Sequence, residues 1–167
     1  GGLLLTQGYR MERITVWLDP AASEKGHQTI QGLYAIGSGG LFGKGLGQSM
    51  QKLGFLPEAN NDMIFSVICE ELGLFGALCV LALFFALIWR FMVIAVNAPD
   101  LYGSMIVVGV IAHIGIQVFI NIAVATNTIP NTGIPLPFIS YGGSSLVFML
   151  LEMGLVLSVS RYINVKK

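Results

Sequence analysis

Three long apolar stretches constrain the fold of this chain more than any other feature. They run from Met63 to Trp89, from Ser104 to Ala125 and from Phe138 to Val159. A helix needs about 20 apolar residues to cross a hydrocarbon core of about 30 Å, and each stretch exceeds that length. Backbone amides and carbonyls find no water in lipid, so such a segment crosses as a helix. The sequence therefore predicts an all-α membrane protein with three transmembrane helices.

Composition supports the membrane assignment and argues against other classes. Hydrophobic residues make up 54% of the 167 residues and charged residues only 11%, whereas soluble domains carry about 25% charged residues. The formal net charge is zero, so neither a nucleic-acid surface nor a polybasic lipid anchor is indicated. Cys69 and Cys79 lie about 15 Å apart along one predicted helix, so they cannot form a disulfide with each other.

A polar segment of unusual backbone composition opens the third stretch. Residues 135–145 read Pro-Leu-Pro-Phe-Ile-Ser-Tyr-Gly-Gly-Ser-Ser, with two prolines, two glycines and four hydroxyl side chains. Proline and glycine do not support a lipid-exposed helix interior, so this backbone must be buried in protein or line a wet cavity. We expect a broken or capped helix start there, with hydroxyls and free amides available to polar groups.

This segment and the residues before it resemble the signature of the SEDS family, the multispan proteins of bacterial cell-wall synthesis. The residues that carry the resemblance are Asn121, Pro130, Thr132–Phe138 and Ser140–Ser145. Phe138, after the second proline, is more similar to the FtsW and SpoVE branches of division and sporulation than to the RodA branch of elongation. The family usually has about ten spans, and this chain resembles the last three and the long loop before them. The resemblance therefore implies the C-terminal part of a SEDS bundle.

Under that resemblance the chain divides into seven segments. They are the end of a preceding span with a long extracellular loop (1–61), a transmembrane helix (62–90), a cytoplasmic loop (91–103), a second transmembrane helix (104–126), an extracellular Pro/Gly loop (127–137), a third transmembrane helix (138–160) and a cytoplasmic tail (161–167). The orientation follows from Arg90, Arg161, Lys166 and Lys167 at the ends of the spans, because Lys and Arg are enriched in cytoplasmic loops.

The long loop carries a glycine-rich segment with two interpretations. Residues 37–47 do not match a Walker A loop, because Ser38 replaces its first glycine and Gly45 occupies the position of its Ser or Thr. The segment is either a flexible or tightly turned re-entrant loop or a set of exposed amides that contact a diphosphate. Before it, apolar residues recur at helical spacing from His27 to Ile36, which predicts a short amphipathic helix at the membrane surface.

Asp62 is the residue best placed for chemistry. It stands at the outer start of the first span, where a carboxylate meets both the loop and the bilayer edge. Spacing alone also allows a helix N-cap, because Asp accepts hydrogen bonds from first-turn amides and suits the positive end of the helix dipole. The segment is similar to the loop-to-helix junction of the SEDS family, which implies that Asp62 is the aspartate that the family needs for polymerisation. Asn61-Asp62-Met63 departs from the common Thr-Asp-Phe, and Gly26-His27-Gln28 from Gly-Tyr-Gln, but the carboxylate remains.

The resemblance implies a peptidoglycan glycosyltransferase that polymerises lipid II outside the cytoplasmic membrane during division or sporulation. It also implies the release of undecaprenyl diphosphate and a class B penicillin-binding protein as crosslinking partner. An acceptor hydroxyl is a poor nucleophile, so a carboxylate that removes its proton accelerates attack by about 10²- to 10⁴-fold. Asp62 is the candidate for that role or for binding a divalent cation, Mg²⁺ or Mn²⁺. We expect the isolated 167 residues to be inactive, because other spans contribute the walls of the cavity.

Substrate contacts are expected from cations and from the Ser/Gly motif. Positive charge offsets the charge that grows on a leaving diphosphate. The candidates are Lys44, Lys52, Arg13 and Arg10, together with Ser140, Tyr141, Gly142, Gly143, Ser144 and Ser145.

Ionisable residues inside the predicted spans leave other functions open. Glu70 and Glu71 lie two turns inside the first span and Glu152 within the last, where a charge is costly unless it is neutralised, paired or in a polar cavity. These glutamates are either structural contacts or part of the cavity, and His113 is either a buried hydrogen-bonding residue or a proton relay. A lipid-precursor flippase or other carrier would depend on them, whereas a noncatalytic division scaffold would tolerate their loss and that of Asp62. Further polar residues expected to make interhelical contacts are Asn121, Gln117 and Thr126.

Overall fold

The computed structural model describes residues 14–20, 26–45, 47–48 and 62–163. The longer helices in this part of the chain are α2 (His27–Ser38), α3 (Ile64–Val96), α4 (Leu101–Ala125) and α5 (Gly143–Arg161). Residues 14–18 are also helical, and no residue in the described ranges belongs to a β-strand. α3, α4 and α5 are each long and apolar enough to cross a membrane. The prediction of an all-α protein with three membrane helices is confirmed.

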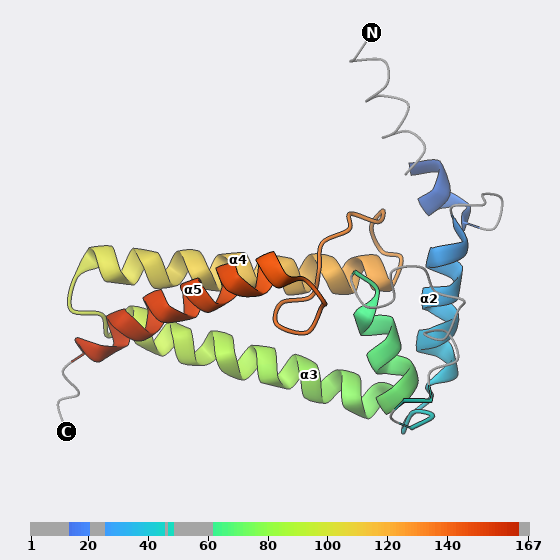
Figure 1. Ribbon diagram of the computed structural model, residues 1–167, viewed down its shortest axis with the longest axis horizontal. Coiled ribbons are helices and arrows are strands. Elements are labelled where there is room, and N and C mark those ends of the chain that lie inside the picture. Colours follow the sequence, from blue (N-terminus) through green and yellow to red (C-terminus); the bar gives the residue numbers. More distant parts are fainter. Residues whose placement is uncertain (1–13, 21–25, 46, 49–61, 164–167) are drawn as a thin grey trace, which may run out of the picture.

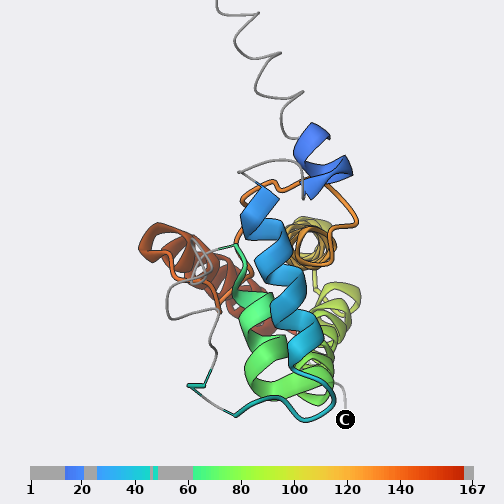
Figure 2. The same cartoon turned by 90° about the vertical axis from the view of Figure 1, so that its right-hand side faces the viewer.

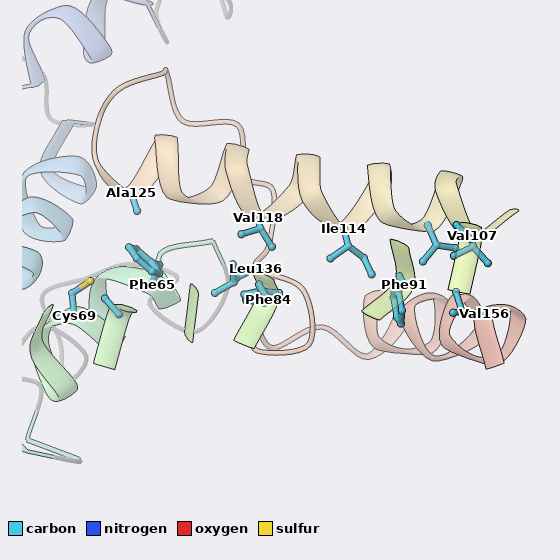
Figure 3. Close-up of a cluster of buried hydrophobic side chains, with 13 residues drawn as sticks. Phe65, Cys69, Phe84, Phe91, Val107, Ile114, Val118, Ala125, Leu136 and Val156 are labelled. Carbon is cyan, nitrogen blue, oxygen red and sulfur yellow. The ribbon is translucent and has the colours of Figure 1, made fainter. Parts of the chain in front are cut away.

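The three long helices run side by side in alternating directions (Figure 1). Their shared core contains Phe84 and Phe91 of α3, Ile114 of α4 and Val156 of α5, all at most 8% exposed. Figure 3 shows these side chains between the helices. α3 and α5 begin, and α4 ends, at the same end of the bundle (Figure 1). This topology places residue 62 and the connection from α4 to α5 at one end, with Arg161 at the other.

α3 is broken at Gly73, whose φ of 69° and ψ of −167° are not helical. Essentially only glycine adopts this conformation without strain. Figures 1 and 2 show that residues 64–72 lie across the bundle beside α2, whereas residues 74–96 run along α4. The straight part has about 23 residues, enough to cross a hydrocarbon core. Glu70 and Glu71 lie in the crosswise segment, inside the helix Ile64–Val96 as expected but before its straight part.

The glycine-rich loop pairs with the backbone groups that the break in α3 leaves open. Lys44 N and Gly45 N donate to Glu70 O and Glu71 O at 2.9 and 3.0 Å, and Leu74 N and Phe75 N donate to Gly40 O and Leu41 O at 2.9 and 3.2 Å. The close approach requires glycine, because a Cβ added to Gly43 would collide with the Glu71 carbonyl. The tight-turn interpretation is therefore correct for this loop, since the Lys44 and Gly45 amides are already bonded and do not form an open anion cradle.

α2 confirms the helix predicted from His27 to Ile36 and extends it to Ser38. Its buried residues, Thr29, Gly32 and Ala35, recur at a spacing of three and form one face. At Gly32 an added Cβ would lie 3.3 Å from Ser66 Oγ, so the missing side chain allows close packing on the crosswise part of α3. One face of α2 is thus covered by α3, while Tyr34 is 62% exposed.

Helix ends differ from the predicted boundaries by three residues or more in three places. α3 continues to Val96, so residues 91–96, expected in a cytoplasmic loop, are helical. α4 begins at Leu101 because the Asp100 side chain caps it, accepting a hydrogen bond from Gly103 N at 3.1 Å. α5 begins at Gly143 and not at residue 138, because Phe138 has a φ of 61° and Gly142 is extended. The α3–α4 connection is therefore shorter than expected, and the Pro/Gly segment is longer.

Candidate active site

Asp62 lies two residues before α3, at the end of the bundle where α4 finishes. α3 begins at Ile64 with Met63 in the N-cap position, and Ser66 N donates to Met63 O at 3.1 Å. The alternative role of Asp62 as the N-cap is therefore wrong, because the helix starts one residue later than that role requires. Asp62 is only 5% exposed, and a carboxylate that is removed from water requires polar partners.

Two helices supply polar groups to the Asp62 residue. Gln28 Nε2 of α2 donates a long hydrogen bond of 3.5 Å to Asp62 Oδ1. Asn121 Nδ2 of α4 donates to Asp62 O at 2.8 Å and also to Ile134 O, in the Pro/Gly segment, at 2.9 Å. Asn121 is 1% exposed. One buried amide thus joins α4 to two segments that are distant in the sequence, and the interhelical role expected of Asn121 is confirmed.

Gln117 of α4 and Thr126, the C-cap of α4, behave differently from Asn121. Thr126 Oγ1 donates to Ile122 O of its own helix at 2.9 Å, so its expected interhelical contact is wrong. A hydroxyl at the last turn of a helix competes well for the carbonyls there, which lack intrahelical donors. Gln117 Oε1 is buried without a hydrogen-bond partner among the described residues.

The Pro/Gly segment forms a closed turn before α5. Leu136 N donates to Ser140 Oγ at 2.7 Å, and Ser140 N donates to Leu136 O at 3.1 Å. Phe138 lies within this turn in the left-handed region, with a φ of 61°, a conformation that is unfavourable for a bulky residue. The two hydrogen bonds around it hold the turn in place. The Ser140 hydroxyl therefore has a structural bond in the described chain.

The remaining motif residues surround the start of α5. Tyr141 is 82% exposed, and Gly142 is the N-cap, with its carbonyl accepting from Leu146 N at 3.0 Å. Gly143, Ser144 and Ser145 form the first turn, where amides have no intrahelical acceptor. The described link between this region and the Asp62 segment is the Asn121–Ile134 hydrogen bond. A direct contact of Ser140–Ser145 with Asp62 stays a prediction.

Lys44 is paired with a buried glutamate. Its Nζ lies 2.7 Å from Glu70 Oε1, where the Lys44 side chain is 35% exposed and the Glu70 side chain 0% exposed. Ser38 Oγ, at the end of α2, donates to the same oxygen at 3.5 Å. Glu70 is thus a structural contact of the kind that the sequence allowed. Contact of Lys44 with a diphosphate stays a prediction, and the other candidate cations, Lys52, Arg13 and Arg10, lie outside the described residues.

A divalent cation at Asp62 can be tested against the available donors. Within the described ranges no three His, Cys, Asp or Glu side chains group together as a metal site, so at most one further side chain of these types could join Asp62 as a ligand. Mg²⁺ is usually held by one or two carboxylates together with substrate phosphates and water. The donor set at Asp62 therefore fits a cation that binds together with a diphosphate.

A second polar pair lies farther along the bundle, between α4 and α5. His113 Nδ1 lies 2.7 Å from Glu152 Oε1, and the two side chains are 45% and 24% exposed. The other carboxylate oxygen, Glu152 Oε2, is buried without a partner in the described part of the chain. Both residues thus make an interhelical contact, as one interpretation of Glu152 had it. His113 is a hydrogen-bonding residue, but the expectation that it is buried is wrong, because its side chain is 45% exposed.

Gln28 is the residue near Asp62 that sequence reasoning did not select. The signal was present, because Gln28 belongs to the tripeptide compared with the family's Gly-Tyr-Gln. Its approach to Asp62 depends on the packing of α2 against the crosswise part of α3, which no local pattern predicts.

Comparisons with known proteins identify the family. A family model described as "Cell cycle protein", which covers FtsW, RodA and SpoVE, matches residues 2–165. The chain therefore belongs to this family, the SEDS family, as its sequence motifs predicted.

Relatives with known names support the branch assignment. The chain is 56% identical over 165 residues to stage V sporulation protein E of Bacillus subtilis (strain 168), covering 96% of this chain and 44% of that protein. It is 44% identical over 160 residues to a probable peptidoglycan glycosyltransferase FtsW of Geobacter sp. (strain M18), covering 95% of this chain and 44% of that protein. The chain thus spans less than half of the length of these relatives.

Solved structures agree with the fold. A chain from work on the structural coordination of polymerization and crosslinking by a peptidoglycan synthase complex matches with a TM-score of 0.73 and 32% identity, over 95% of this chain and 43% of that one. The crystal structure of the rod shape determining protein RodA of Thermus thermophilus matches with a TM-score of 0.61 and 39% identity, over 78% of this chain and 39% of that one. Together with its three apolar helices, these matches make the chain part of a multi-pass membrane protein.

Proposed function

We propose that the protein containing this chain is a peptidoglycan glycosyltransferase that polymerises lipid II into glycan strands during division or sporulation. The observation that carries the proposal is Asp62, a buried carboxylate at the end of a membrane bundle, held by side chains of α2 and α4. The name probable peptidoglycan glycosyltransferase, given to relatives that are 44% identical, supports it.

In the proposed reaction Asp62 is the general base. The acceptor sugar hydroxyl transfers its proton to the carboxylate as its oxygen bonds to the anomeric carbon of the donor. The bond between that carbon and the diphosphate breaks at the same time, and undecaprenyl diphosphate leaves with the bonding electrons. A single displacement of this kind inverts the anomeric centre and needs only one catalytic carboxylate. General-base assistance is worth about 10²- to 10⁴-fold in rate.

The leaving diphosphate requires positive charge or hydrogen-bond donors. The open amides of Gly143–Ser145 at the start of α5 are suitable donors, because helix N-termini favour anions. Lys44, which pairs with Glu70 of the crosswise part of α3, is a candidate cation, and Lys52 and Arg13 are further candidates. If Asp62 binds a metal instead of acting as the base, a Mg²⁺ or Mn²⁺ ion held by Asp62 and the diphosphate would supply further neutralisation.

The same proposal sets the orientation in the membrane. Arg161 lies in the last turn of α5, at the end opposite Asp62. Basic residues favour the cytoplasmic side, so the C-terminus is cytoplasmic and Asp62 faces outward. A class B penicillin-binding protein is the proposed partner, and the match to a chain of a synthase complex that polymerises and crosslinks supports that choice.

The test is glycan-strand formation from purified lipid II by the full-length protein and its Asp62→Asn variant. Asn is nearly isosteric but cannot accept the proton, so we expect a fall of about 10²-fold or more with abundance and membrane insertion unchanged. Asp100→Asn is the matched control, because Asp100 caps α4 at the opposite end of the bundle and Asn is an equally good cap. Polymerisation by Asp62→Asn near the wild-type rate would exclude Asp62 as the base.

Carriage of a lipid-linked precursor is a second candidate function, and one observation favours it. The His113–Glu152 pair is an ionisable contact within the bundle, and such pairs mark substrate or proton pathways in carriers. Translocation of labelled lipid II across vesicles by the full-length protein, lost in Glu152→Gln and retained in Asp62→Asn, would establish it in place of polymerisation.

A further inference from the structure

We propose that Asn121 is a positioning residue for Asp62, which holds the main chain of the carboxylate residue where the reaction needs it. The inference rests on the proposed function, because it assigns Asn121 a part in the same site. From its polarity in an apolar span, Asn121 was expected only to make an interhelical contact; the proposal gives it a role in the site.

Both N–H groups of the Asn121 side-chain amide donate hydrogen bonds. The side-chain nitrogen has two protons, and it donates to Asp62 O at 2.8 Å and to Ile134 O at 2.9 Å. Its Oδ1 atom is buried without a partner among the described residues. The fold therefore depends on donation by this amide, and not on its acceptor.

The Asp62 carbonyl is bonded by α4 and does not receive the usual helical donor of α3. In a continuous helix the carbonyl of residue 62 would accept from Ser66 N, but that amide donates to Met63 O at 3.1 Å. Asn121 N–H takes the place of the helical donor at Asp62 O. The support comes from α4, a straight helix whose neighbours Val118 and Ala125 lie in the shared core. The carboxylate residue is thereby tied to a rigid element.

The second bond of Asn121 fixes the other side of the site. Ile134 precedes Pro135, which has no N–H to donate, and lies just before the closed turn of Leu136 and Ser140. Because one nitrogen bonds both carbonyls, a change at Asn121 shifts the Asp62 segment and the Pro/Gly segment relative to each other. Misplacement of a catalytic group by about 1 Å can reduce turnover about 10²-fold without loss of substrate binding.

The experiment measures kcat and KM for lipid II with full-length Asn121→Leu and Asn121→Asp. Both side chains are close to Asn in size; Leu has no donor, and Asp has at most one, in place of the two of Asn, and only when it is protonated. We expect each to lower kcat by about 10²-fold with KM within about twofold of wild type. Gln117→Leu is the matched control, since it removes an amide one turn away on α4, and we expect its kcat to stay within about threefold of wild type.

The outcomes separate this inference from the proposed function. If Asp62→Asn abolishes polymerisation while Asn121→Leu and Asn121→Asp behave like Gln117→Leu, the positioning role is wrong and the proposed function stands. If Asp62→Asn is active, the proposed function itself fails. A loss that appears only in KM also overturns the positioning role. If Asn121→Leu does not accumulate in membranes, Asn121→Ala replaces it, because its smaller side chain cannot clash and has no donor, and an unchanged kcat in that variant counts against the proposal.

Discussion

Replacement of Gly73 by alanine should collapse the junction between the two parts of α3. Gly73 has a φ of 69° and a ψ of −167°, a region that costs other residues about 1–3 kcal/mol. A Cβ at this position would also collide with the backbone of Gly43 and lie 2.6 Å from Leu41 O. These atoms belong to the glycine-rich loop, which cannot move aside without separating from α3.

The size of the effect follows from the hydrogen bonds at the break. Four backbone bonds join the loop to α3 across Gly73, and each contributes about 0.5–1.5 kcal/mol. If strain and the loss of half of these bonds combine, Gly73→Ala destabilises the protein by about 2–6 kcal/mol. Gly109→Ala in α4 is the control, because an added Cβ there meets no atom within 4 Å, and alanine is favoured over glycine in a helix by about 1 kcal/mol.

The measurement is the apparent melting temperature and the yield of monodisperse full-length protein in detergent. We expect Gly73→Ala to melt well below wild type, and Gly109→Ala to melt at or above it. A Gly73→Ala protein as stable as Gly109→Ala would show that the break and its paired loop do not contribute to stability, and the argument for a glycine-dependent junction would be wrong.

Two further predictions concern the membrane part of the bundle. Glu152→Leu should lower the melting temperature, because it leaves His113 unpaired, with a loss of about 0.5–2 kcal/mol in the free energy of unfolding. The double variant His113→Leu/Glu152→Leu should recover most of that stability. Equal losses in both variants would contradict an interhelical pair. A cysteine at the exposed Thr132 should react with an impermeant thiol reagent added outside intact cells, and one at Asn97 should not. The opposite labelling pattern would reverse the orientation and remove the external site.

Local sequence patterns were sufficient to identify the class of protein. Length and hydropathy identify membrane helices because lipid imposes the same requirement on every spanning segment. The run from Asn121 to Ser145 and the carboxylate at Asp62 carried the family resemblance that the comparisons confirmed. Helix ends were less accurate, because they depend on single capping residues such as Asp100 and on the left-handed Phe138.

The tertiary structure decided how those parts form a site. Apolar residues continue on both sides of Glu70 and Glu71, so hydropathy could not reveal that α3 turns at Gly73 and places Glu70 before the straight part of the helix. The glycine-rich loop bonds the backbone groups at the break in α3. Lys44 pairs with the Glu70 side chain, and Asn121 bonds the Asp62 carbonyl. These hydrogen bonds join residues 26 to 59 positions apart, and such pairings arise from the packing of whole helices and not from the local sequence. The type of a residue determined which chemistry its side chain can perform. The packing of the helices determined which groups that side chain contacts.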